Sequence, residues 1–144
     1  MKYMVILKAN ADSEAGVAPS EEIINGMQKF NEDLANAGVL LAAEGLQASS
    51  KGARVKFEAD GTKKVTDGPF AETKELVAGF WILQVKSRDE AIEWTKRIPN
   101  PGWDEFEVEV RKVFEAEDFG EEFTPEARAA EDKLRERVEA QQQK

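Results

Sequence analysis

The most apolar stretch of the chain, LVAGFWILQV at residues 76–85, limits what the sequence can fold into. It is rich in β-branched and aromatic residues, and it is much shorter than the roughly 20 apolar residues that span a bilayer. A run of this kind is typical of a central β-strand that is covered on both faces. The rest of the fold has to be arranged around this predicted strand.

Two segments are predicted to form helices that cover one face of the sheet. The first follows Ser20, a good N-cap residue, and Gly38 is a stop signal at its end. The second begins at SRDE, residues 87–90, which predicts a capping box with Ser at the N-cap and Glu three residues later. The sequence PNPG at 99–102 ends it. The apolar face of the first helix has the 4-3-4 spacing expected of a helix and consists of Ile23, Met27, Phe30 and Leu34.

Further strands are predicted at residues 2–8, 39–46 and 106–110. In the last of these, apolar and charged residues alternate with the period of a strand that has one exposed face. Residues 54–66 predict a hairpin, because apolar residues alternate with charged ones on both sides of Asp60-Gly61, the commonest signal for a type I′ turn.

The order of these elements predicts an α+β fold of the ferredoxin-like type, βαββαβ, with an inserted β-hairpin. Thr124 and Pro125 match the N-cap and first position of a further helix near the C-terminus. We therefore expect a ferredoxin-like domain over residues 1–120 and a C-terminal helical extension over 121–144.

The two helices would leave one face of the sheet uncovered. Because the strand at 76–85 is apolar on both sides, we expect this face to pack against another copy of the chain. A two-fold homodimer is the simplest assembly that buries it. The predicted assembly is a dimeric α+β barrel.

The composition excludes several classes of function. The net charge of −9 without a basic stripe argues against nucleic-acid binding. The chain has no cysteine and no histidine, which removes disulfides, thiol nucleophiles, imidazole acid-base catalysis and His-ligated metal sites. No transmembrane segment or secretory signal is recognised, so we expect a cytoplasmic protein without membrane association.

The stretch VTDGPFAETKELVAGFW resembles the signature of the YCII-related, DGPF-type proteins, and the likeness extends over roughly residues 1–125. The resemblance implies a dimeric α+β barrel and a mostly bacterial, uncharacterised group, some of whose genes lie beside extracytoplasmic-function sigma factors. A His-Asp pair has been proposed to act in the wider superfamily. Here Gln47 and Ala48 stand where many relatives read His-Pro, so any catalytic base in this chain must be a carboxylate.

Three acids are the predicted acid-base candidates. Asp67 lies in the Asp-Gly-Pro corner, where it can equally be a turn residue that bonds the backbone. Glu72 follows it, and its alternative is a solvated surface residue. Glu44 interrupts an apolar strand, where a structural ion pair with Arg54 or Lys56 is the alternative. Ligand-binding roles are predicted for Gln47, Arg54, Phe70, Trp81 and Trp103.

Neither a metal nor a nucleotide cofactor is predicted. The acidic stretch FEAEDFGEEF lacks the ligand spacing of an EF-hand loop, and no Gly-rich phosphate loop occurs. Two functions remain open. One is a small-molecule site at the dimer cleft with carboxylate-based isomerase or lyase chemistry. The other is a non-catalytic regulatory or protein-interaction module, for example a partner of a sigma factor.

Overall fold

The computed structural model describes residues 1–143, apart from the side chain of Lys74. The chain divides into two units, Met1–Lys112 and Val113–Lys144, each with its own internal contacts. The first unit contains β1 (Lys2–Lys8), α1 (Ala11–Glu14), α2 (Glu21–Asn36), β2 (Leu40–Gly45), β3 (Ala53–Phe57), β4 (Lys63–Asp67), β5 (Val77–Gln84), α3 (Arg88–Thr95) and β6 (Val108–Lys112). Short 3₁₀ turns lie at Ser49–Lys51 and Thr73–Glu75. The second unit contains a 3₁₀ segment, Ala116–Glu122, and α4 (Pro125–Gln142).

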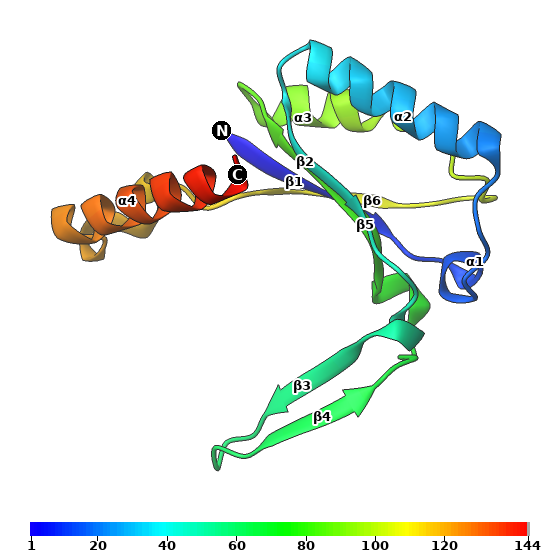
Figure 1. Cartoon of the computed structure of the whole chain (residues 1–144), viewed down its shortest axis with the longest axis horizontal. Coiled ribbons are helices and arrows are strands. Elements are labelled where there is room, and N and C mark those ends of the chain that lie inside the picture. The colour runs from blue at the N-terminus through cyan, green and yellow to red at the C-terminus, as the bar shows by residue number, and fades with distance from the viewer. Residues whose placement is uncertain (144) are drawn as a thin grey trace. The chain divides into compact units, whose positions relative to one another are not determined.

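The first unit has an antiparallel sheet in the order β2-β5-β1-β6. This order is the one that a βαββαβ chain adopts in a ferredoxin-like fold, and β5 is a central strand, as its apolar sequence predicts. Helices α2 and α3 lie on the same side of the sheet (Figure 1). The α+β class is confirmed, and the hairpin β3–β4 forms a separate two-stranded sheet.

The core lies between the sheet and the two helices. Alternate residues of β1 and β5 face the helices, so that Val5 stands beside Trp81 and both are buried. Phe30 of α2 packs edge-on against Trp81, with ring centroids 5.8 Å apart, and Leu34 is fully buried. The remaining buried members of this core are Tyr3, Leu7, Val39, Leu83, Val85, Ala91 and Ile98.

The opposite face of the sheet, which we call the open face, is not covered by a helix. Its apolar residues are half-buried and come from three neighbouring strands: Met4, Ile6, Ala42, Phe80 and Ile82. Glu44, Phe80, Ile6 and Glu109 stand in one row across the sheet. An apolar pair in the centre is therefore flanked by a carboxylate on each edge strand.

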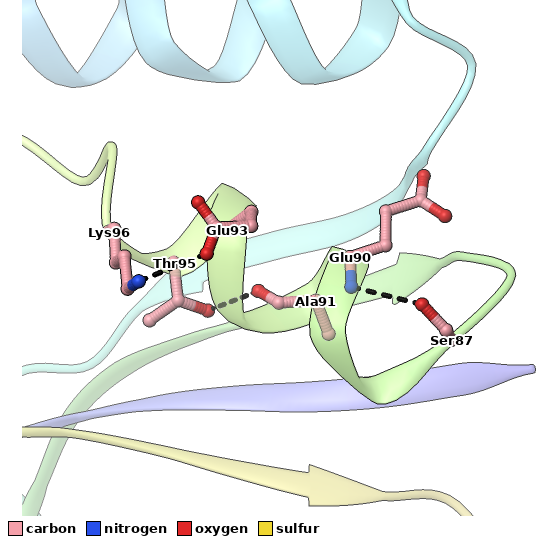
Figure 2. Close-up of polar contacts among 6 residues, drawn as sticks. All are labelled: Ser87, Glu90, Ala91, Glu93, Thr95 and Lys96. Carbon is pink, nitrogen blue, oxygen red and sulfur yellow. Dashed lines mark hydrogen bonds and ion pairs between the residues drawn. The ribbon is translucent and has the colours of Figure 1, made fainter.

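Both helix starts are found where the caps predict them. The side chain of Ser20 accepts a hydrogen bond from the Ile23 N–H at 3.3 Å. The side chain of Ser87 accepts one from the Glu90 N–H at 3.1 Å (Figure 2). The predicted reciprocal half of the second capping box is different, because the Glu90 carboxylate accepts from the N–H of Lys86 at 2.8 Å, one residue before the cap.

Two element boundaries differ from the sequence prediction. The last strand begins at Val108 rather than near residue 106. Residues 11–14, for which no helix is predicted from the sequence, form the short helix α1, because Asn10 and Ser13 cap it reciprocally through their side chains and backbone N–H groups. This turn places Glu14 against the segment that follows β2.

The hairpin also differs from its prediction at the turn. Glu58 N–H donates to the Thr62 carbonyl at 2.8 Å, and Gly61 N–H donates to the Glu58 carbonyl at 3.0 Å. The loop therefore runs over residues 59–61 and is longer than the two-residue loop of a type I′ turn. Gly61 supplies the left-handed conformation, with φ of 92°, that ends such a loop. Asp60 closes it by accepting from both the N–H and the hydroxyl of Thr62.

In the second unit, α4 begins after Thr124, whose hydroxyl accepts from the Ala127 N–H at 3.1 Å. Glu131 and Arg135, four residues apart on the helix, form an ion pair at 2.8 Å. Before the helix, the ring of Phe119 stacks on Phe114 with centroids 4.9 Å apart and lies 5.4 Å from Phe123. The aromatic side chains thus form a small cluster within this unit.

Candidate functional site

The first unit contains a larger and a smaller hollow, and the larger one has a volume of about 980 Å³. Its walls come from the α1–α2 connection, one face of α2, the adjoining ends of β2 and β5, and the loop at residues 101–103. The lining is mostly apolar, and Ile23, Met27 and Trp81 supply much of it. A mostly apolar hollow of this size with a few polar groups is what small organic ligands occupy in proteins.

The apolar wall is held in place by the core. Met27 and Asn31 follow Ile23 at successive helical turns, which puts all three on the same side of α2. The Asn31 side-chain oxygen accepts a hydrogen bond from Trp81 Nε1 at 2.8 Å. Because Trp81 is 6% exposed and also packs on Phe30, its ring has one fixed orientation. Trp81 is therefore a core residue that also lines the hollow.

The loop that carries Trp103 is fixed by the side chain of Asn100. The Asn100 oxygen accepts from the N–H groups of Gly102 and Trp103, each at 2.8 Å, and the Asn100 amide donates to the Trp103 carbonyl at 2.9 Å. Gly102 has φ of 90°, and a Cβ there would lie 2.7 Å from Cδ1 of Ile23. The left-handed backbone conformation therefore favours glycine at position 102, next to Ile23 of α2.

A smaller hollow of about 400 Å³ shares the segment 46–48 and Lys51 with the larger one. It is lined by polar groups from separate parts of the chain, including Glu14, Gln47 and Arg54, and by the ring of Phe70. The Arg54 guanidinium lies 4.0 Å from the centre of the Phe70 ring, a cation–π distance. Together the two hollows provide an apolar wall, in the larger hollow, and a polar end, in the smaller one.

Glu14 is the most unusual group at this polar end. One carboxylate oxygen, Oε2, accepts a hydrogen bond from the Ser49 N–H at 2.7 Å. The other, Oε1, is buried and has no hydrogen-bond partner among the residues that the structure describes. Leaving a buried polar atom unpaired costs roughly 1–3 kcal/mol, and more when the group is charged. Oε1 is therefore an unsatisfied acceptor that belongs to a residue lining the smaller hollow.

The Asp-Gly-Pro-Phe corner, residues 67–70, reaches the smaller hollow through Phe70. Gly68 N–H donates to the Gly52 carbonyl at 3.0 Å, and Phe70 N–H donates to the Ser49 hydroxyl, also at 3.0 Å. A Cβ on Gly68 would overlap the Ser49 carbonyl. The corner is therefore docked by its backbone onto the same segment that holds Glu14.

The structure distributes the predicted residues unequally. Four of them line the larger hollow: Glu44, Gln47, Trp81 and Trp103. Gln47 also lines the smaller hollow, together with Arg54 and Phe70. Because side chains alternate along a strand, Glu44 points to the open face and its neighbour Ala43 points to the other face of the sheet. Glu44 therefore lies at the edge of the larger hollow.

Asp67 and Glu72 lie outside both hollows. Asp67 ends β4 and Glu72 precedes the 3₁₀ turn with φ of 62°; both side chains are exposed. Their acid-base role stays a prediction. Sequence reasoning missed Glu14 because its segment resembles an ordinary polar loop, and the available signal was the pairing of Asn10 with Ser13 as a helix cap.

Within residues 1–143, no cluster of acidic side chains has the grouping needed to hold a metal ion. Among the helices described there, none combines the length and the apolar character required to cross a membrane.

Comparison with known proteins now agrees with the resemblance in the sequence. The profile of the YCII-related domain matches residues 1–117. An uncharacterized protein, R00369 of Rhizobium meliloti (strain 1021), is 31% identical over 93 residues, which cover 65% of this chain and 74% of the relative. The chain belongs to the YCII-related family.

Proposed function

We propose that the protein binds a small organic molecule whose apolar body occupies the larger hollow and whose hydrogen-bond donor reaches Glu14 Oε1. The observation that carries this proposal is the buried, unpartnered oxygen of Glu14. A carboxylate only accepts hydrogen bonds, so the ligand group must be a donor such as a hydroxyl or an ammonium. The apolar and aromatic wall favours an aromatic or branched aliphatic body.

The same geometry supports carboxylate chemistry at this position. Ser49 N–H holds Oε2 in place, while Oε1 is left to accept a proton. A ligand that carries an acidic hydrogen next to Oε1 would meet a general base there. In this proposal the isomerase or lyase role predicted from the sequence passes to Glu14, and Gln47 and Arg54 orient the ligand.

The test is a thermal-shift and calorimetric titration with tyramine and phenol as probes and benzoate as a probe without a donor. A ligand that binds only the folded state raises its stability. We expect tyramine or phenol to raise Tm with increasing concentration, and Glu14→Gln to weaken that binding about tenfold, equivalent to roughly 1.4 kcal/mol. Glu105→Gln removes the same charge from an exposed position outside both hollows and should leave binding unchanged.

The stability of the unliganded variant separates a binding role from a structural one. An amide costs less to bury than an unpaired carboxylate, so Glu14→Gln without ligand should be at least as stable as the wild type. If Glu14→Gln binds the probes as well as wild type does, or if neither tyramine nor phenol shifts Tm, the proposal is wrong.

We further propose that the first unit pairs through its open face as a dimeric α+β barrel. The half-buried apolar residues of that face, among them Ile6, Phe80 and Ile82, support this pairing. Glu44 belongs to the open face by register and also borders the larger hollow. A second copy packed on this face would therefore lie beside the larger hollow at Glu44. The ligand site would then be at the dimer cleft, as the sequence predicted.

A second candidate function, a protein-interaction module, is favoured by the surface of the second unit. Phe114 is 70% exposed, and Leu134 and Val138 are 51% and 43% exposed at successive turns of one face of α4. Exposed apolar stripes of this kind are typical of interaction sites. A purified extracytoplasmic-function sigma factor is the probe: biolayer interferometry should detect binding that Leu134→Ser with Val138→Ser abolishes. Absence of binding by the wild type would remove this candidate.

A further inference from the structure

The hydrogen bond between Asn31 and Trp81 fixes the orientation of an amide in the wall of the larger hollow. Helix α2 lines this hollow with Ile23, Met27 and Asn31, and Asn31 is the polar member. Its side-chain oxygen accepts from Trp81 Nε1 at 2.8 Å. Because an indole N–H only donates, the oxygen must be the atom that faces it, and the amide nitrogen takes the other position.

The amide nitrogen, Asn31 Nδ2, carries two N–H donors and has no hydrogen-bond partner among the residues that the structure describes. It is not enclosed, because Glu14 Oε1 is the one side-chain polar atom of the described chain that is buried without a partner. Asn31 as a whole is half-buried. Nδ2 is therefore an accessible donor on a residue that lines the larger hollow.

The surroundings of this donor are apolar. Met27 lies one helical turn before Asn31, and Ala43 stands beside Trp81 in the sheet. A hydrogen bond is electrostatically stronger in such surroundings than in water. A ligand without an acceptor would displace water from the donor and leave it unpaired, which is costly. A donor placed in this way selects among ligands.

The sheet beneath the larger hollow leaves room for the body of a ligand. Ala43 and Trp81 form one row on the helix-facing side, and the next row on that side consists of Leu7, Gly79 and Gly45. Gly79 and Gly45 have no side chains, and a Cβ added at Gly45 would have no atom within 4 Å. At this row the floor of the hollow is therefore largely peptide backbone.

We propose that Asn31 determines which ligands the larger hollow accepts, by donating a hydrogen bond from Nδ2 to a carbonyl or similar oxygen acceptor on the ligand. This inference rests on the proposed function, because a small organic molecule has to occupy the hollow. It narrows the ligand class to aromatic or branched aliphatic molecules that carry an oxygen acceptor for Asn31 as well as a donor for Glu14. A hydroxyaryl ketone has this chemistry.

Three probes separate the contact at Asn31 from the contact at Glu14. The first, para-hydroxyacetophenone, carries a hydroxyl donor and a carbonyl acceptor. In para-isopropylphenol a methyl group replaces the carbonyl oxygen, and in acetophenone the hydroxyl is absent. Calorimetric titration gives Kd for each probe. The ratio between the two phenols then reports the acceptor contact, and the ratio between the two ketones reports the donor contact.

Asn31→Asp is the decisive variant. A carboxylate is close in size to the amide and still accepts from Trp81 Nε1, but it offers no donor in place of Nδ2. We expect it to weaken binding of para-hydroxyacetophenone about tenfold relative to para-isopropylphenol, because the carbonyl then meets an acceptor. Asn36→Asp adds the same charge at an exposed position of the same helix, outside both hollows, and should leave this ratio unchanged.

The second measurement uses the wild-type chain and so does not depend on the folding of a variant. In ¹H–¹⁵N spectra, the hydrogens on Asn31 Nδ2 should shift downfield when para-hydroxyacetophenone binds, and they should shift less with para-isopropylphenol. A purely structural role of Asn31, as the partner of Trp81, would not produce this difference.

Two results would overturn the inference: an unchanged ratio between the two phenols in Asn31→Asp, or an Asn31 side-chain amide that responds equally to both phenols. Failure of the proposed function has a different signature. If Glu14→Gln leaves the ratio between the two ketones unchanged while Asn31→Asp acts as expected, the contact at Glu14 is wrong and the contact at Asn31 stands. If none of the three probes binds the wild type, both proposals are wrong.

Discussion

Replacing Gly68 by alanine tests the role of the Asp-Gly-Pro-Phe corner most directly. The added methyl would overlap the Ser49 carbonyl, so the corner or the segment beneath it must move. Displacement of this kind costs about 1–3 kcal/mol. It also weakens the hydrogen bonds made by the N–H groups of Gly68 and Phe70, each worth about 0.5–1.5 kcal/mol. The expected loss of stability is therefore about 2–6 kcal/mol when both hydrogen bonds are lost.

The assay combines thermal unfolding with amide hydrogen exchange. For a chain of this size, about 1 kcal/mol corresponds to roughly 2–4 °C in Tm, so a fall of about 4–24 °C is expected. If the corner detaches locally, the Gly68 and Phe70 amides lose protection while the core keeps its own. Gly52→Ala is the matched control, because its Cβ would meet only the Ser49 carbonyl at an ordinary 3.7 Å. A Gly68→Ala protein with unchanged Tm and protected amides would refute the reasoning.

Three further predictions concern the core and the β3–β4 hairpin. Leu34→Ala, at a fully buried position, should lower the free energy of unfolding by about 2–5 kcal/mol in denaturant titration; a loss below 1 would contradict the packing described. Asn31→Leu leaves the buried Trp81 Nε1 unpaired and should cost about 1–3 kcal/mol with a changed tryptophan emission, whereas unchanged emission would show that the bond is not formed. Hydrogen bonds from the Thr62 side chain and backbone hold the pKa of Asp60 below its ordinary 3.8. The stability that these bonds add is therefore present above pH 3.8 and is lost as the pH falls through the folded-state pKa. In an NMR titration, Thr62→Val should move the midpoint of Asp60 upward.

The elements that local chemistry encodes were predictable. Ser20, Ser87 and Thr124 each cap a helix through a side chain that acts within three residues, so no tertiary contact is needed to place these starts. The apolar stretch at 76–85 likewise indicated a central strand from its own residues, without any tertiary contact. Finer boundaries were less predictable, because the start of β6 at Val108 depends on its register with β1.

The candidate site shows the opposite case. Gln47, Arg54 and Phe70 were predicted as ligand contacts, and they do line one hollow. Glu14 was not predicted, because nothing in its neighbours along the chain indicates burial. Its Oε1 is buried only because the chain brings Ser49, 35 residues later, against the carboxylate.

The sequence by itself determined the fold class, the family and the absence of imidazole and thiol chemistry, because caps, periodicity and composition act locally or through simple exclusion. The tertiary structure alone decided which residues share a site. The Asp-Gly-Pro-Phe corner is an example. Its amino-acid sequence identifies the family, but only the folded structure shows that its backbone contacts Ser49 and Gly52. Burial, hydrogen-bond partnership and cavity shape all depend on residues distant in the chain, and no local pattern encodes them.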